Sequence, residues 1–138
     1  MTKEKMIDSL NGDLADEFAS AIQYINHAAL ITGARFGSIQ KELLVHATEE
    51  MQHATTIADQ VAFLGGKPST AVDAVLTSDD PEEMLRQDLQ GEQSAVARYK
   101  SRIREAMDLG EFGLARVLQD ILVMEEEHVK DLQNALGL

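Results

Sequence analysis

Apolar residues recur along the chain at alternating spacings of three and four, which is the period of an α-helix with one buried face. Over residues 3–32 this row consists of Ile7, Leu10, Leu14, Ala21, Tyr24, Ala28 and Ile31. Thr2 precedes the row as a suitable N-cap, and Gly33 follows it as a helix stop. The pattern predicts a first helix over residues 3–32 with one face in a hydrophobic core.

The second predicted helix spans residues 38–64 and carries two apolar rows instead of one. Ser38 is the expected N-cap, and Gly65, Gly66 and Pro68 end the pattern. The inner row consists of Ile39, Leu43, Ile57, Val61 and Leu64, and the row beside it of Leu44, Ala47, Met51, Ala54 and Ala58. A helix that packs only within its own bundle needs one row. The second row therefore favours contact with another subunit, and a broad core-facing surface is the alternative.

Residues 65–80 show no apolar periodicity and separate the second helix from the third. Helices of about 27 residues are roughly 40 Å long. About sixteen extended residues span about 50 Å, which is enough to return along such a bundle. The second and third helices are therefore expected to run parallel, joined by a crossover.

Two further helices complete the chain. The third covers residues 81–108, with Asp80 as N-cap and Glu83 completing a capping box. The fourth follows a turn around Gly110, and its apolar row consists of Leu114, Leu118, Ile121, Leu132 and Ala135. The sequence thus predicts an all-α fold in a single domain over residues 1–138. The expected architecture is an antiparallel four-helix bundle with a long crossover between helices two and three, and no fifth helix.

Six polar residues interrupt the apolar rows near the middle of the predicted helices. They are Glu17, Glu50, His53, Glu92, Glu125 and His128. In two Glu-x-x-His motifs, residues 50–53 and 125–128, the glutamate and the histidine are three apart and share one helix face. A bundle brings all these midpoints to one depth, and unrelated polar core residues would have no reason to agree in this way.

This set of donors suits a pair of divalent transition-metal ions. Four buried carboxylates without cations would repel one another and partly protonate, whereas two divalent ions balance their charge. The same ligand set occurs in di-iron and di-manganese carboxylate bundles, and oxygen with imidazole donors suits iron or manganese. The chain contains no cysteine, which excludes thiolate sites and disulfides.

Composition and charge restrict the partners. The 138 residues carry a formal charge of -12, which argues against binding to nucleic-acid phosphates. Residues 1–8 are polar and lack the apolar segment of a signal peptide. No run of about 18 apolar residues is present to span a membrane. We therefore expect a cytoplasmic protein with no nucleic-acid and no membrane partner.

Several motifs resemble those of bacterioferritins. In chain order they are Leu10-Asn11, Glu17, Gln23-Tyr24, His27-Ala28, Glu49 to Ala54, Phe63 to Gly66, Asp79 to Leu89, Glu92, and Glu125 to His128. The resemblance covers residues 7–136 and implies a ferritin-like fold. It also implies that the six polar residues are ligands of a ferroxidase centre with two iron ions per chain, bridged by Glu50 and Glu125.

Met51 matches the methionine that binds haem iron in bacterioferritins, one from each subunit across a two-fold axis. The resemblance therefore implies a haem or related porphyrin shared between two chains and bound by Met51. It also implies a dimer as the building block of the assembly. Packing alone is the alternative explanation for a methionine in an apolar row.

The chain also departs from the bacterioferritin pattern. The fifth helix, which helps to close the larger shell of that family, has no counterpart here, so we expect a twelve-subunit cage, with a bare dimer as the alternative. Met124 stands where the family usually has an acidic residue. His46 is expected either as an iron ligand beside the centre or as a hydrogen-bonded core histidine. Asp88 is expected to orient a ligand histidine, and His27 to be structural.

Together these features predict a bacterioferritin-like ferroxidase that oxidises Fe(II) with dioxygen or peroxide for iron storage. A rubrerythrin-like peroxidase and a manganese catalase on the same bundle are alternatives, and so is a non-enzymatic haem-binding bundle. The absence of cysteine weighs against a rubrerythrin, because its electron-transfer module needs thiolates. A non-enzymatic bundle would leave the six aligned polar residues unexplained.

Overall fold

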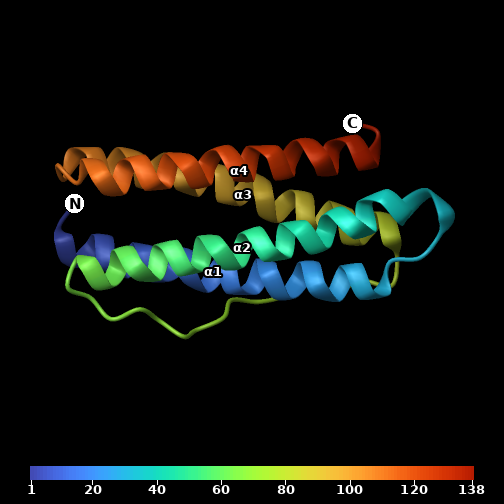
Figure 1. The fold of residues 1–138 in the computed structure, drawn as a ribbon, viewed down its shortest axis with the longest axis horizontal. Helices are drawn as coiled ribbons and strands as arrows, with labels where there is room; N and C mark the ends of the chain where they lie inside the picture. The colour runs from blue at the N-terminus through green and yellow to red at the C-terminus, as the bar shows by residue number, and fades with distance from the viewer.

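The computed structural model describes residues 1–138, with four long helices and no strand (Figure 1). The helices are α1 (Lys3–Leu30), α2 (Gly37–Phe63), α3 (Pro81–Asp108) and α4 (Phe112–Leu136), and a short 3-10 helix, η1 (Ala34–Phe36), precedes α2. The all-α prediction is confirmed, with small shifts at the helix ends. None of the helices combines the length and the apolar character needed to cross a membrane.

α1 and α3 begin with the side-chain caps that the sequence predicts. The Thr2 hydroxyl accepts a hydrogen bond from the Lys5 amide at 3.2 Å, and Asp80 Oδ2 accepts one from the Glu83 amide at 3.0 Å. The predicted capping box is wrong, because the Asp80 amide donates to Ser78 Oγ at 3.0 Å. A serine two residues upstream therefore takes the role expected of Glu83.

α2 begins without a side-chain cap, so the predicted N-cap role of Ser38 is wrong. Gly33 adopts a φ of 110°, a conformation open mainly to glycine, and turns the chain out of α1. η1 then runs directly into α2, which starts at Gly37, and Phe36 is buried at the junction. The buried ring of Phe36 thus anchors the start of α2, which has no side-chain cap.

α1 and α2 form one antiparallel hairpin, and α3 and α4 form another (Figure 1). α2 and α3 run in the same direction, so the crossover of residues 64–80 returns along the length of the bundle, as predicted. Each helix packs mainly against its partner in the hairpin, and contacts between the hairpins are fewer.

Side chains of α1 hold the crossover in place. Asn11 Nδ2 donates to the Lys67 carbonyl at 3.1 Å, and Asn11 Oδ1 accepts from the Ser69 amide at 2.8 Å. Further along, Gln23 Oε1 accepts from the Leu76 amide at 2.9 Å. Because these bonds go to backbone groups, they fix the path of the crossover over α1.

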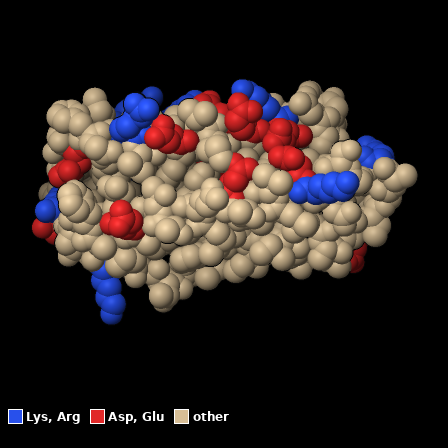
Figure 2. All heavy atoms as spheres, viewed as in Figure 1, with Lys and Arg blue, Asp and Glu red and all other residues tan.

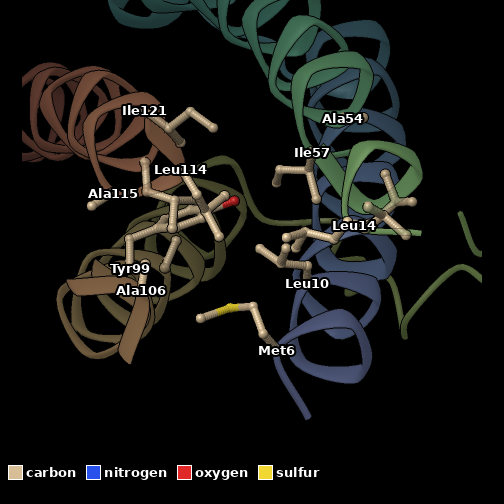
Figure 3. Packing of buried hydrophobic residues seen from close by; sticks show 14 residues of the cluster. Met6, Leu10, Leu14, Ala54, Ile57, Tyr99, Ala106, Leu114, Ala115 and Ile121 are labelled. Carbon is tan, nitrogen blue, oxygen red and sulfur yellow. The ribbon is translucent and has the colours of Figure 1, made fainter. Parts of the chain in front are cut away.

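The buried apolar residues form two clusters, one toward each end of the bundle. The first, shown in Figure 3, contains Met6, Leu10, Leu14, Ala54, Ile57, Val61, Leu64, Ala95, Tyr99, Ala106, Leu114, Ala115, Leu118 and Ile121. The second contains Tyr24, Ala28, Ile31, Phe36, Ile39, Leu43, Ala47, Met84, Leu85, Leu89 and Leu132. On every helix the predicted polar donors lie between the two clusters, so the bundle has a polar layer in its middle.

Candidate metal centre

The six predicted donors come from all four helices and are buried together in this middle layer. Their exposed fractions lie between 0% and 6%. α1 supplies Glu17, α3 supplies Glu92, and the two Glu-x-x-His motifs of α2 and α4 supply the others. Isolated buried charges are very costly, so a set of this size needs partners of opposite charge.

The first group of donors surrounds the imidazole of His53. His53 Nδ1 lies 3.2 Å from Glu125 Oε1, and 3.6 Å from both Glu17 Oε2 and Glu50 Oε1. One atom from each of these four residues lies within 4.8 Å of the others. The group therefore offers three oxygens and one nitrogen around one point.

The second group surrounds the imidazole of His128 in the same manner. His128 Nδ1 lies 3.1 Å from Glu50 Oε1, 3.3 Å from Glu92 Oε1 and 3.5 Å from Glu125 Oε1. Glu50 and Glu125 thus belong to both groups, while each group has one further glutamate and one histidine of its own. Two adjacent positions with two shared carboxylates result.

Many donor atoms in this layer have no hydrogen-bond partner. They are Glu17 Oε2, Glu50 Oε1, His53 Nδ1, Glu92 Oε2, both carboxylate oxygens of Glu125, and His128 Nε2. Buried polar atoms are almost always paired, and a cation is the partner that clustered carboxylates and imidazoles accept. The residues present therefore fit a pair of metal ions.

Burial acts to raise the pKa of Glu17, Glu50 and Glu125, but their neighbours act in different directions. Burial raises the pKa of Glu50 and of Glu125 well above the usual range, and the charges of neighbouring carboxylates raise it further. Burial also acts to raise the pKa of Glu17. In that case the close approach of His53 and Glu50 outweighs burial, and the pKa of Glu17 is lowered. The pKa of Glu17 therefore shifts in the opposite direction to those of Glu50 and Glu125.

The two imidazoles are held in their protonated form when only protein surrounds them. Burial acts to lower the pKa of His53, but the nearby carboxylates of Glu125, Glu17 and Glu50 raise it to about 12. Burial also opposes the charge of His128, and its interactions with Glu92 and other carboxylates raise its pKa. Without metal, the positive charge of the protonated rings offsets the carboxylate charge that divalent ions would otherwise neutralise.

Two tyrosines donate hydrogen bonds to glutamates of the centre. The sequence predicted them only as core residues. Tyr24 of α1 donates its hydroxyl hydrogen to Glu92 Oε1 of α3 at 2.5 Å, and Tyr99 of α3 donates to Glu17 Oε1 of α1. Burial raises the pKa of both hydroxyls well above the usual value, so both stay protonated donors. Each tyrosine follows the glutamate of its own helix by seven residues, a repeated spacing that would have revealed the pair.

The predicted role of Asp88 as a partner of a ligand histidine is wrong. Asp88 Oδ1 lies 2.9 Å from His27 Nδ1 and also accepts from Gln23 Nε2 at 2.9 Å. His27 Nε2 lies 3.1 Å from the Leu76 carbonyl of the crossover. At this turn α3 faces α1, so Asp88 reaches the structural histidine and not a ligand of the centre.

His46 lies in the core beside two carboxylates, and these three residues offer a third group of possible metal donors. It is fully buried, and its Nε2 lies 3.0 Å from Asp131 Oδ2 and 3.9 Å from Glu42 Oε1. Its ring stacks on that of His128 with 4.0 Å between centroids and an angle of 26°. Burial lowers the pKa of His46, so the ring is neutral where it packs against the centre.

Met51 lies outside the bundle, as its position after Glu50 predicts. Its side chain is 47% exposed, and Leu44, one helical repeat earlier, is 51% exposed. The predicted second row is nevertheless partly wrong, because Ala47 and Ala54 are buried in the bundle. Charged side chains gather over α4 in Figure 2, and the surface over α1 and α2 below carries few of them.

Comparison with known protein families matches residues 7–138 to the ferritin-like domain. The chain belongs to the ferritin-like family. A bacterioferritin from Brucella melitensis is 31% identical to it, over 97% of this chain and 84% of that protein. The ferritin-like bundle and the similarity to bacterioferritins, both predicted from the sequence, are confirmed.

Two solved structures of the family align over nearly the whole chain. A ferritin-like diiron-carboxylate protein from Bacillus anthracis superposes with a TM-score of 0.93 and 30% identity, covering 99% of both chains. The bacterioferritin-related protein of Bacteroides fragilis, described as a dodecameric thioferritin, superposes with a TM-score of 0.91 and 29% identity. This alignment covers 99% of the present chain and 87% of the other.

Proposed function

We propose that the protein is a ferroxidase that oxidises Fe(II) within each four-helix bundle for iron storage. The observation that carries the proposal is the sharing of Glu50 and Glu125 between two buried donor groups. Relatives named bacterioferritin, and a structural neighbour described as a diiron-carboxylate protein, support iron as the substrate.

In this proposal each of the six donors has a distinct role. Glu17 and His53 bind one Fe(II), Glu92 and His128 bind the other, and the two shared glutamates bridge the pair. Two adjacent ions supply two electrons to one oxidant molecule, either dioxygen or hydrogen peroxide. Carboxylate ligands suit this reaction because hard oxygen donors bind iron in both oxidation states.

The tyrosines position the terminal carboxylates during this reaction. Tyr24 and Tyr99 each direct one oxygen of Glu92 and Glu17, respectively, and leave the second oxygen without a protein partner. Because both hydroxyls remain protonated, they donate to the carboxylates before and after iron binds. Such supporting hydrogen bonds orient metal ligands and tune their basicity.

Titration and mutation test the proposal together. Anaerobic titration of the metal-free protein with Fe(II) should show two tight sites per chain, and addition of oxidant should then oxidise both ions. Glu125→Ala should slow oxidation at least about tenfold. Its neighbour Glu126 is exposed on the same helix, so Glu126→Ala is the matched control and should oxidise iron normally. One Fe(II) per chain, or equal rates in the two variants, would refute the assignment.

We also propose that the protein assembles into a twelve-subunit cage built from dimers. The neighbour from Bacteroides fragilis is described as dodecameric and aligns with 99% of this chain. The exposed side chains of Leu44, Val45 and Met51 on α2 offer an apolar surface for a second copy. A porphyrin bound by Met51 from two chains is part of this proposal and depends on that dimer.

A further inference from the structure

A polar groove lies between α1 and α3, on the side of the bundle that the crossover follows. It encloses about 280 Å³. Asp16, Ser20 and Gln23 of α1 line one wall at spacings of four and three, and Gln87, Gly91 and Ser94 of α3 line the other. Two helices thus present small or polar residues to each other over about two turns, where a bundle would usually pack apolar ones.

A second, smaller cavity continues from this groove toward the metal centre. Ser20, Gln23 and Gly91 line both spaces, and the inner one adds Tyr24, Asp88 and Glu92. The inner cavity leaves about 10 Å³ for the centres of water-sized molecules, which is room for about one water. The groove therefore narrows to the width of one small molecule where it meets Glu92.

Gly91 is the one glycine that lines both the groove and the inner cavity. A glycine inside a helix costs about 1 kcal/mol relative to alanine. Neither backbone conformation nor crowding requires one here, because φ is not positive and an added Cβ would meet no atom within 4 Å. The glycine leaves free the space that a longer side chain would occupy at the wall shared by the groove and the inner cavity.

The inner cavity is lined by Glu92, a residue of the centre with one unpaired carboxylate oxygen. Glu92 Oε2 is buried without a hydrogen bond, while Glu92 Oε1 accepts from Tyr24. The charges along the way are already paired: Asp16 with Arg98 at 2.7 Å, and Asp88 with His27 at 2.9 Å. The other polar groups of the walls are hydroxyls and amides, which suit a neutral molecule that forms hydrogen bonds, and Ala19, Ala74 and Leu76 complete the lining.

A different opening serves the other end of the centre. Between α2 and α4, a cavity of about 330 Å³ reaches His53 and carries the Asp120 carboxylate. Its volume accommodates a hydrated cation, although the Asp120 carboxylate is paired with Arg116 at 3.4 Å. The inner cavity at Gly91, with room for about one water, excludes an ion that carries a full hydration shell.

We propose that the groove and the inner cavity form a passage, the Gly91 passage, that admits water and hydrogen peroxide to the metal pair at Glu92, while Fe(II) enters from the His53 side. The proposal rests on the ferroxidase function and names its oxidant. Two Fe(II) each give one electron, the O–O bond of one hydrogen peroxide breaks, and two protons complete two water molecules. The products are two Fe(III) and two waters, and both protons can come from solvent along the same passage.

Blocking the passage with a larger side chain tests the proposal. Gly91→Leu places an isobutyl group in the shared space, and Gly12→Leu is the matched control. Gly12 is likewise an exposed glycine inside a helix, with no atom within 4 Å of an added Cβ, but it lines neither space. Leucine is the better helix former, so both variants should fold.

Stopped-flow oxidation of protein preloaded with two Fe(II) per chain gives the primary measurement. With hydrogen peroxide, Gly91→Leu should react at least about tenfold more slowly than wild type, and Gly12→Leu within about twofold of it. The rate of anaerobic Fe(II) binding should be the same in all three proteins. Equal peroxide rates in the two leucine variants would overturn the proposal, and so would slower Fe(II) binding in Gly91→Leu.

A measurement without redox chemistry separates this proposal from the ferroxidase function. With Mn(II) bound at the centre, the relaxation rate of solvent water protons reports water exchange. Gly91→Leu should lower the Mn(II)-induced increase in this relaxation rate by about half or more, and Gly12→Leu should leave it unchanged. If wild type fails to oxidise iron but shows this pattern, the passage stands and the ferroxidase proposal falls. If Mn(II) binds and Gly91→Leu leaves this increase unchanged, the passage is refuted. A chain that binds no metal pair refutes both.

Discussion

Loading the metal-free protein with two divalent ions near neutral pH should release about four protons per chain, because metal ligands must give up the protons they hold. Two of these protons lie on Glu50 and Glu125, whose pKa values burial raises well above the usual range. The other two lie on His53, with a pKa of about 12, and on His128, with a raised pKa. Metal binding replaces all four.

The balance of charge in the centre also predicts that about four protons are released per chain. In the metal-free centre, carboxylate charge balances the two imidazolium rings, and it includes the charge of Glu17, whose pKa is lowered. In the loaded centre, two divalent ions balance four ionised carboxylates beside two neutral rings. A buried site disfavours net charge in either state, so two ions exchange for about four protons.

The exchange makes metal affinity strongly dependent on pH. Protons compete with the ions, so affinity falls as the pH falls. With about four protons displaced, one pH unit changes the free energy of binding the pair by about 5 kcal/mol, since each proton contributes about 1.4 kcal/mol. Oxidation activity should therefore be lost over a narrow acid range while the apoprotein stays folded.

Anaerobic titration with Mn(II) in two buffers of different ionisation enthalpy measures the proton count directly. Manganese avoids the protons that ferric hydrolysis would add. Glu126→Gln, an exposed change on the same helix as Glu125, is the control and should leave the count unaltered. A release of fewer than about two protons with both sites filled would refute this picture of the apo centre.

Three further predictions concern stability and assembly. Asp13→Ala should lower the free energy of unfolding in urea by about 3 kcal/mol, because it removes the buried partner of Arg98 and Arg102. The exposed Arg116–Asp120 pair is the comparison, and it should contribute less than about 1 kcal/mol in the same measurement. Met51→Leu should abolish porphyrin absorbance in protein made with ample haem, and no absorbance in wild type would leave Met51 as a packing residue. Mass measurement in solution should give twelve subunits, and a stable dimer would contradict the cage.

The helices and the six donors were predictable because both depend on periodicity along one segment. A spacing of three and four fixes which residues share a face. Glu17, for example, interrupts an apolar row whatever the neighbouring helix does. The same reasoning placed Asp80 correctly as a cap, since its partner is only three residues away.

What the sequence did not reveal depends on how the helices are rotated relative to one another. The bonds from Tyr24 to Glu92 and from His27 to Asp88 join residues 68 and 61 positions apart. Periodicity puts Asp88 on an inward face but does not say whether α1 or α4 lies opposite. The Gly91 passage was missed for a related reason: a cavity is made by two helices and is absent from either row alone.

The division of the bundle into two hairpins has a mechanical consequence. The α1–α2 hairpin carries Glu17, Glu50 and His53, and the α3–α4 hairpin carries Glu92, Glu125 and His128. Each hairpin packs mainly within itself, and the crossover is the one covalent connection between them. Ions held by both hairpins would therefore act as a removable cross-link through the middle of the subunit. Iron content would then set the stiffness of the subunit as well as its cargo, and amide hydrogens near the middle of all four helices would exchange more slowly in the loaded protein than in the empty one.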